Sequence, residues 1–347
     1  MSEQPDFTSP SLSRRDLFRT MSLAAGGAML LGLPNMLMGR IGTAEAALQK
    51  RAFTATTMSL EVDGQFAGRL AAVEGGGLFA DIVGEPPGQD MIQHKRTGPV
   101  RFEDIVLDMP LGAAEKPLSI WITDTLTKGS MPKSGAISYG DMNSTEIKRL
   151  EFTGAVLSEV AFSEADGGEG KEAPSVKLRL VSQSIRLMGG KGKSSAPFST
   201  KSKQLSSANF RFNVQGLEQA CTRITSVSGV AARRAVAGTT AGQDKFRQSA
   251  PASVLDCSTV RILLPEMDAG PFYAWFDDMV FKGNPGAERG GLLEWLDPTM
   301  KNVLASVQLG GLGIVRYQPE PTKPSTLERV GGLVAVDMYC ETLNVVL

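Results

Sequence analysis

An internal repeat constrains the fold of this 347-residue chain more than any other feature of its sequence. Residues 117–129 read P-x3-W-x2-D-x3-K-G, and residues 271–283 read the same pattern 154 positions later. Toward the end of each copy the shift grows to 158, where 176–180 aligns with 334–338. Small loop insertions leave such a drift between two copies of one unit. We therefore predict a tandem duplication, with one domain at 53–188 and a second at 208–347.

Alternation of apolar and polar residues predicts that each copy is built from short β-strands. Residues 58–62 and 210–214 alternate in this way and run into Gly64 and Gly216, as strands that enter a hairpin do. The glycine-rich stretches 75–98 and 229–253 hold few apolar residues, which indicates long loops or flexible hairpins. We expect further strands at 69–73, 102–107, 135–139, 150–160 and 176–187 in the first copy, and at 221–227, 259–264, 291–295, 304–317 and 333–346 in the second.

The repeated P-x3-W segment carries the signals of one helix in each copy. Its proline suits the first turn of a helix, and its closing glycine suits the C-terminal cap. Apolar residues recur at helical spacing and include Trp121 and Trp275, so we expect core packing of these indoles rather than a ligand platform. The predicted fold class is mainly β: two tandem antiparallel β-barrel or sandwich domains, each with one covering α-helix. Residues 189–207, rich in Lys, Ser and Gly, are predicted to be a flexible linker.

The first 46 residues have the order of an export signal. Arg14 and Arg15 stand directly before an apolar stretch at 21–38, and Ala44 and Ala46 supply the small-x-small pattern that signal peptidase requires. This order resembles a Tat signal peptide, so we expect cleavage near Ala46 and delivery to the periplasm or the extracellular space. A permanent membrane anchor and a cytosolic amphipathic leader are the alternatives. No second apolar run of spanning length follows, so membrane contact is expected only through this segment.

Charge and residue types argue against nucleic-acid binding and against catalysis. The 36 Lys and Arg nearly cancel the 37 Asp and Glu, so a basic nucleic-acid footprint is missing. His94 is the only histidine and lies in a glycine-rich stretch, so neither a catalytic triad nor a metal site can be built around it. We expect no enzymatic activity, no cofactor and no metal.

The three cysteines, Cys221, Cys257 and Cys340, are widely spaced and odd in number. They match neither a disulfide framework nor a metal knuckle. One disulfide could form in an oxidising compartment, but we expect buried free thiols.

The matched pattern resembles the tail tube protein family of contractile-tail phages, which includes the inner tubes of bacterial contractile injection systems. The family pattern opens with a hairpin of the form φ-x-V-x-G and a later V-x-G, continues with a helix that has an early Trp, and ends in closing strands. The matching residues are 60–64 with 73–75, 117–129, 151 onward and 176–187 in the first copy, and 212–216 with 227–229, 271–283, 307–317 and 334–343 in the second.

The resemblance implies a structural role in which barrels join side by side through their sheet edges into a ring of six domains, and rings stack into a tube. Two such domains on one chain imply a trimer with pseudo-sixfold symmetry. If the linker joins stacked rings instead, six chains form a double ring. The expected partners are further copies of this chain and other injection-system components. Tail tube subunits are usually single-domain and cytosolic, so two domains behind an export signal favour an assembly outside the cytoplasm or a hub-like adaptor.

Two other function classes remain open. One is an exported, monomeric β-barrel module that binds a ligand in a concave aromatic pocket, although three Trp and four Tyr leave few aromatics for it. The other is an exported enzyme of unknown type. The assembly state of the mature protein separates these classes from the structural one.

Overall fold

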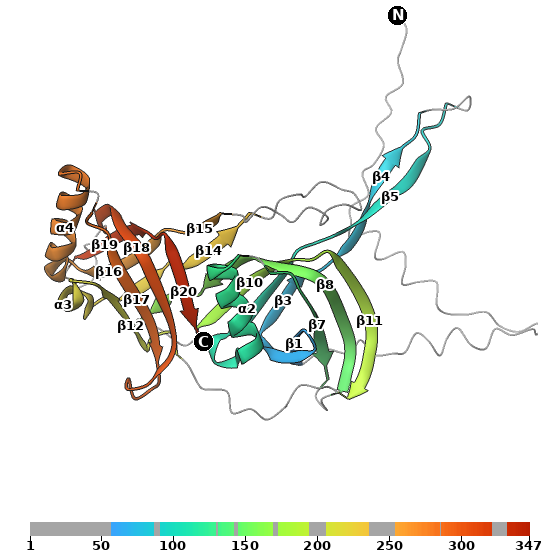
Figure 1. Cartoon of the computed structure of the whole chain (residues 1–347), viewed down its shortest axis with the longest axis horizontal. Helices are drawn as coiled ribbons and strands as arrows, with labels where there is room; N and C mark the ends of the chain where they lie inside the picture. The colour runs from blue at the N-terminus through green and yellow to red at the C-terminus, as the bar shows by residue number, and fades with distance from the viewer. Residues whose placement is uncertain are drawn as a thin grey trace, which may run out of the picture. The chain divides into compact units, whose positions relative to one another are not determined.

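Antiparallel β-strands form most of the chain that the structure describes (Figure 1). The computed structural model describes residues 57–86, 91–129, 131–141, 145–168, 173–193, 206–235, 254–284, 286–320 and 332–347. All of them belong to one unit, Phe53–Leu347.

The first half is a curled sheet with the strand order β2-β1-β7-β8-β10-β6-β3, and β11 pairs with β8. Because β2 also contacts β6, the sheet nearly closes into a barrel. A separate two-stranded sheet is formed by β4 and β5. The bounds are β1 (Thr57–Val62), β2 (Gln65–Leu70), β3 (Ala72–Gly75), β4 (Leu78–Gly84), β5 (Lys95–Phe102), β6 (Ile105–Pro110), β7 (Lys133–Gly140), β8 (Thr145–Phe162), β10 (Ser175–Val181) and β11 (Ser184–Lys193).

The second half has the order β12-β17-β18-β19-β16-β13, which repeats that of the first half without a counterpart of β2. In it β20 pairs with β18, and β14 and β15 form a hairpin. The bounds are β12 (Phe210–Val214), β13 (Ser226–Ser228), β14 (Ala231–Arg234), β15 (Leu255–Cys257), β16 (Val260–Pro265), β17 (Arg289–Leu296), β18 (Val303–Pro319), β19 (Leu333–Tyr339) and β20 (Thr342–Val346).

The register of the two halves also corresponds. In the first half Leu178 of β10 lies opposite Val160 of β8, and in the second half Val336 of β19 lies opposite Tyr317 of β18. The prediction of a mainly β fold with antiparallel sheets is confirmed.

One main helical segment follows the fifth repeated strand position in each half. These segments are α2 (Lys116–Thr127) and α4 (Gly270–Phe276), the latter continued by a π-helical turn, η3 (Asp277–Phe281). Trp121 and Trp275 lie at matching positions and are buried. Their Nε1 atoms donate hydrogen bonds to the carbonyl oxygens of Met131 at 3.1 Å and Ala287 at 2.7 Å. Short 3-10 turns, η1 (Leu111–Ala113) and η2 (Glu266–Asp268), precede the helices.

The strand predicted at 221–227 is wrong. A short helix, α3 (Glu218–Cys221), occupies its start, and only β13 remains of the strand. Leu217, Ala220 and Cys221 are buried at i, i+3 and i+4, which is helical rather than alternating spacing. The matching prediction at 69–73 is interrupted, because a bend at Ala71 separates β2 from β3.

Four other predicted segments differ from the structure. The long strands predicted at 176–187 and 333–346 are each interrupted by two residues, at 182–183 and 340–341, and the segments on either side of the break run in the same direction along β8 or β18. The loop or hairpin predicted at 75–98 contains the hairpin of β4 and β5. The linker predicted from residue 189 starts too early, because β11 continues to Lys193 and pairs with the long strand β8 over this stretch. Residues 194–205 lie outside the described part of the chain.

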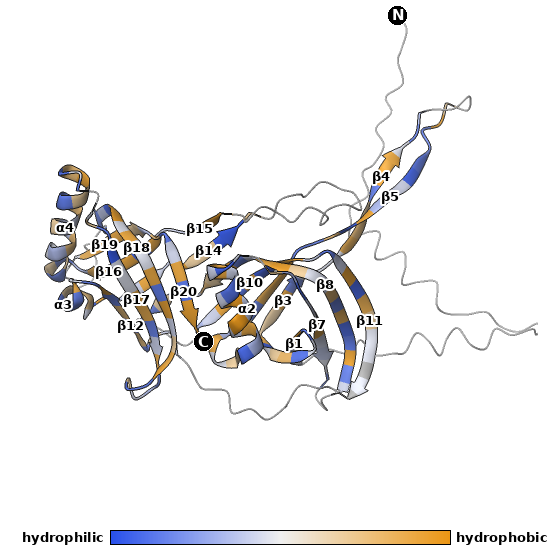
Figure 2. Ribbon diagram, in the orientation of Figure 1, coloured by the Kyte–Doolittle hydropathy of each residue, from blue (hydrophilic) through white to orange (hydrophobic). Residues whose placement is uncertain are grey.

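Alternation along the strands places the apolar side chains in the core. Figure 2 shows hydrophobic and hydrophilic residues following one another along the long strands. In β10, Val176, Leu178 and Leu180 are fully buried, whereas Lys177 and Arg179 between them are exposed.

Two glycines of the repeated V-x-G pattern have the same backbone requirement. Gly75 and Gly229 have φ of +76° and +77°. A Cβ atom at Gly75 would lie 2.0 Å from the carbonyl oxygen of Asp104, and one at Gly229 would lie 2.2 Å from that of Thr259. Only glycine fits the left-handed conformation at this close approach of two chain segments.

Candidate assembly surfaces

Backbone hydrogen bonds between strands join the two halves of the described chain. β14 pairs antiparallel with β8, with Ala232 opposite Val160 and Arg233 opposite Glu159. A second, short ladder joins β13 to β9 (Ala165–Asp166). The hairpin of the second half therefore extends the sheet of the first half, and we call this contact the internal interface.

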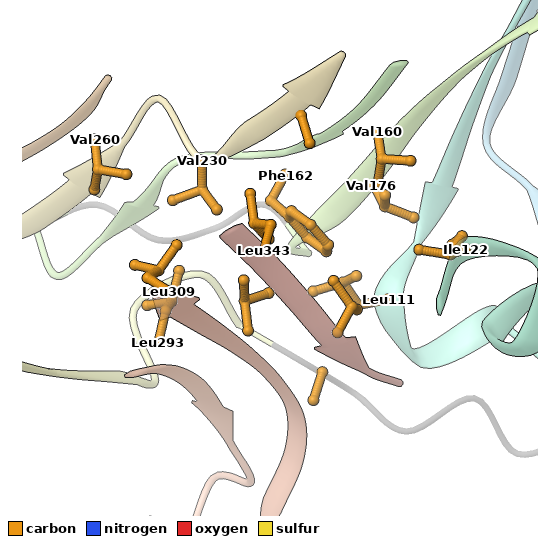
Figure 3. Close-up of a cluster of buried hydrophobic side chains, with 14 of the residues drawn as sticks. Leu111, Ile122, Val160, Phe162, Val176, Val230, Val260, Leu293, Leu309 and Leu343 are labelled. Atoms are coloured by element: carbon orange, nitrogen blue, oxygen red, sulfur yellow. The ribbon is translucent and has the colours of Figure 1, made fainter. Parts of the chain in front are cut away.

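Apolar side chains of the two halves also pack against one another at the internal interface. Phe162 of β8 stacks on Trp295 of β17, with ring centroids 5.7 Å apart. Figure 3 shows the surrounding cluster, whose side chains come from both halves and belong to one continuous core. Burial of apolar surface stabilises such a contact by about 25 cal/mol per Å². The labelled members of the cluster are Leu111, Ile122, Val160, Phe162 and Val176 from the first half, and Val230, Val260, Leu293, Leu309 and Leu343 from the second.

Two arginines of β14 add polar contacts to the internal interface. Arg234 donates hydrogen bonds to two carbonyl oxygens in the last turn of α2, where unpaired carbonyls favour a cation. Arg233 Nε donates to Glu159 Oε1 at 2.8 Å, and Arg179 Nε donates to Glu159 Oε2 at 3.2 Å. Burial raises the pKa of Glu159, but the hydrogen bonds from Arg233 and Arg179 outweigh it and hold this pKa below its ordinary value of 4.5.

Helix α2 of the first half packs on β20 of the second half. Thr123 Oγ1 donates a hydrogen bond to the carbonyl oxygen of Val345 at 3.2 Å. In this contact Leu126 of α2 is 5% exposed and Val345 of β20 is 2% exposed.

The counterpart of the β14–β15 hairpin in the first half has no such partner. Leu78 of β4 lies opposite Phe102 of β5, and Ala232 of β14 lies opposite Cys257 of β15. Leu78 therefore corresponds to Ala232. Within the described residues, β4 and β5 pair only with each other, whereas β14 also pairs with β8. Ala232 is 3% exposed and Leu78 is 44% exposed. The hairpin also exposes Phe79, Ile82 and Val100. An apolar hairpin with a free backbone edge is a surface suited to a partner strand.

The C-terminal part of β18 offers the complementary edge. Tyr317 of β18 lies opposite Val336 of β19, and Val160 of β8 lies opposite Leu178 of β10. This part of β18 therefore corresponds to the stretch of β8 that pairs with β14. That stretch of β8 lies between β10 and β14. On β18 the corresponding stretch has β19 on one side, and no strand of the described ranges pairs with its other side.

The contact between α2 and β20 has exposed counterparts as well. Leu187 of β11, which matches Val345 of β20, is 49% exposed, and the next residue, Met188, is 43% exposed. Val280 of η3, which matches Leu126 of α2, is 46% exposed. The apolar residues that are buried at the internal interface thus have exposed equivalents on the outer sides of the two halves.

The sequence reasoning did not single out Leu78 or Leu187, and it counted Val280 among the apolar residues at helical spacing in the second repeated helix. Each is an apolar residue at a regular position of a strand or helix, which is also the pattern of a core residue. These residues differ from core residues in their solvent exposure. A comparison of matched positions in the structure reveals this difference, and the sequence does not.

The residues predicted to direct export, Arg14, Arg15, Ala44 and Ala46, lie outside the described residues, so export remains a prediction.

His94 lies exposed just before β5, and its carbonyl oxygen accepts a hydrogen bond from the backbone N–H of Glu85. Among the described residues, no three His, Cys, Asp or Glu side chains are grouped to hold a metal ion. No helix in these ranges has the length and apolar character needed to cross a membrane.

A groove of about 620 Å³ lies over β12, β17, β18 and β20. Amide side chains line it, including Asn213, Gln308 and Asn344, and glycines at 290, 291 and 310 lie beside them. None of the described residues that line it is aromatic. The groove therefore differs from the concave aromatic pocket expected of a ligand-binding module.

No protein family and no curated protein matches the chain. Among solved structures, the chain is similar to a sheath-tube complex of an extracellular contractile injection system (PVC), with 14% identity over 43% of this chain and 99% of the other, at a TM-score of 0.35. It is also similar to the tube-terminating cap of the anti-feeding prophage, with 11% identity over 48% and 99%, at 0.35. A third similarity is to Hcp1 from Flavobacterium johnsoniae, with 18% identity over 39% and 96%, at 0.25.

Proposed function

We propose that this protein is a non-enzymatic structural subunit that assembles with further copies of itself into a ring. The proposal continues the resemblance to tail tube proteins carried by the two P-x3-W segments and the two V-x-G patterns. It also includes a tandem duplication of one domain and association of the ring with other components of an injection-system-like assembly.

One observation carries the proposal: each side of the internal interface has an unoccupied equivalent elsewhere on the described chain. The β4–β5 hairpin is equivalent to the β14–β15 hairpin, and the end of β18 is equivalent to the part of β8 that receives β14. A neighbouring copy that used the same geometry would place Leu78 of its β4 opposite Tyr317 of β18. Val280 of η3 would then pack on β11 of that neighbour, which carries Leu187, as α2 packs on β20 within one chain.

Such a contact is heterologous, because the second half of one copy meets the first half of the next. A heterologous contact gives a ring when its rotation closes. Closure pairs every such edge and buries the exposed apolar hairpin, which favours it over a free monomer. The side-by-side ladders within one chain favour three chains in one pseudo-sixfold ring over two stacked rings.

Light-scattering mass of the protein without residues 1–46 tests the proposal. We expect a mass of three chains, and loss of that mass in Phe79→Asp, which places a charge on the exposed face of β4 without changing a buried residue. Met131→Asp is the matched control, because Met131 is similarly exposed but lies outside the proposed contact. A mass of six chains would support the double ring instead. A monomer at high concentration would overturn the assembly proposal.

A monomeric ligand-binding module is the second candidate, and the amide-lined groove favours it. Amide and hydroxyl groups beside three glycines suit a polar ligand that is bound by hydrogen bonds. A monomeric protein that binds soluble oligosaccharides, with binding lost in Gln308→Ala and Asn344→Ala, would promote this candidate.

We also propose export through the Tat pathway to the periplasm or the extracellular space. Arg14 and Arg15 before the apolar stretch, with Ala44 and Ala46 after it, support this proposal.

A further inference from the structure

Two of the three cysteines lie side by side, although 82 residues separate them in the sequence. Cys257 ends β15, and Cys340 lies in the two-residue break between β19 and β20. The Cys257 thiol contacts the carbonyl oxygen of Glu341, the residue after Cys340, at 3.7 Å. The Cys257 and Cys340 side chains also share a hydrogen bond. This arrangement brings the two sulfur atoms to the same point of the fold.

The surroundings give the two thiols different roles. The hydrogen bond from Cys340 lowers the pKa of the Cys257 thiol, and the same hydrogen bond raises the pKa of the Cys340 thiol. Cys257 is half-buried, whereas Cys340 is 6% exposed. Cys257 is therefore the sulfur that solvent reaches and that ionises first, which are the properties of an attacking thiolate.

Cys221 has a different environment. It lies at the end of α3 and is buried, and burial raises the pKa of its thiol to about 11. A thiol of this kind is inert toward oxidants and disulfides. Cys221 is therefore an internal control for the reactivity of Cys257 and Cys340.

We propose that Cys257 and Cys340 form an intrachain disulfide by exchange with a disulfide oxidant, such as glutathione disulfide or a thiol oxidoreductase. The Cys257 thiolate attacks one sulfur of the oxidant, which forms a mixed disulfide and releases one thiol. Cys340 then loses its proton and attacks the Cys257 sulfur, which forms the Cys257–Cys340 bond and releases the second thiol. Overall, two electrons and two protons pass from the protein to the oxidant, whose disulfide is reduced to two thiols.

The bond would hold the hairpin that carries the internal interface. β15 pairs with β14, and β14 pairs with β8 of the first half, so a link from Cys257 to the break between β19 and β20 fixes this hairpin to its own half. The equivalent positions in the first half are Phe102 and Ser182. No such bond can form there, and the β4–β5 hairpin stays unlinked. This inference does not depend on ring formation.

Thiol counting on the full chain tests the proposal. The purified protein is incubated with glutathione disulfide, freed of excess reagent, unfolded in guanidinium and titrated with Ellman reagent. We expect one thiol per chain in the oxidised protein, two in Cys257→Ser and none in Cys221→Ser, because Cys221 alone stays reduced. Peptide mapping should recover a linked pair of peptides that contains Cys257 and Cys340 and weighs two hydrogens less than the separate peptides. Reduction should lower the melting temperature by several degrees in the native sequence and leave that of Cys257→Ser unchanged.

Three free thiols after this incubation would overturn the proposal. So would a persistent glutathione adduct on Cys257, a bond that includes Cys221, or a bond between chains. The thiol count of Cys221→Ser keeps the test decisive if Cys257→Ser fails to fold, because that variant retains both proposed partners.

Discussion

Val345 of β20 and Leu187 of β11 occupy the same register position in the two halves, yet Val345 is 2% exposed and Leu187 is 49% exposed. The difference arises because α2 of the other half packs on β20. Within the described residues, no helix of this chain covers β11 in the same way. The proposed ring would supply that cover from η3 of a neighbouring copy.

Leu187→Asp should therefore weaken assembly without unfolding the subunit. A charge at the centre of an apolar contact must be desolvated, so we expect the dissociation constant of the oligomer to rise by about tenfold to a hundredfold. Sedimentation over a range of concentrations measures it. Met300→Asp is the control, because Met300 is 48% exposed in the turn before β18 and lies outside the proposed contact. Equal effects of the two substitutions would contradict the proposed interface.

Truncation of either buried indole should destabilise the fold by a similar amount. Trp121→Ala and Trp275→Ala each remove a side chain that is 1–2% exposed, together with its hydrogen bond to a backbone carbonyl. We expect a loss of about 3–5 kcal/mol in the free energy of unfolding, measured by urea denaturation. A loss below about 1 kcal/mol at either position would contradict equivalent core roles. The exposed Tyr273→Ala serves as the control on α4.

The Arg233–Glu159 contact should make stability depend on pH in the acid range. Because the folded-state pKa of Glu159 lies below 4.5, its carboxylate stabilises the fold above pH 4.5. This contribution is lost as the pH falls through the lower, folded-state pKa. The difference in unfolding free energy between the native sequence and Glu159→Gln should be constant near neutral pH and shrink below pH 4.5. Since Arg233 is 65% exposed, we expect a difference of about 1 kcal/mol or less. A difference that widens toward acid would contradict this assignment.

Export should depend on the arginine pair. Replacement of Arg14 and Arg15 by lysine keeps the charge but removes the twin-arginine signal, so a full-length precursor should accumulate in the cytosol. Fractionation followed by immunoblotting measures the distribution. Lys50→Arg, a conservative substitution outside the twin-arginine motif, is the control. Unchanged delivery of the double-lysine variant would refute the Tat interpretation.

Alternation and helix signals in the sequence predicted most of the strands and both main helices. The sequence could not predict the interruptions at 182–183 and 340–341, because a two-residue break in a strand that keeps its direction leaves the apolar alternation almost unbroken. It misread 221–227, where four residues of α3 are too few to show a helical period. The internal interface was also beyond the sequence, since Ala232 and Leu78 are both apolar and differ only in what covers them.

The ladder between β8 and β14 joins two parts of one polypeptide, so its strands stay at a high effective concentration however dilute the protein becomes. In the proposed ring, dilution would therefore open only the junctions between chains, and the released piece would always be a preassembled pair of halves. Because the two kinds of junction are built from different residues, they are free to evolve apart. A substitution at the outer junction would then loosen every second joint and leave the others intact.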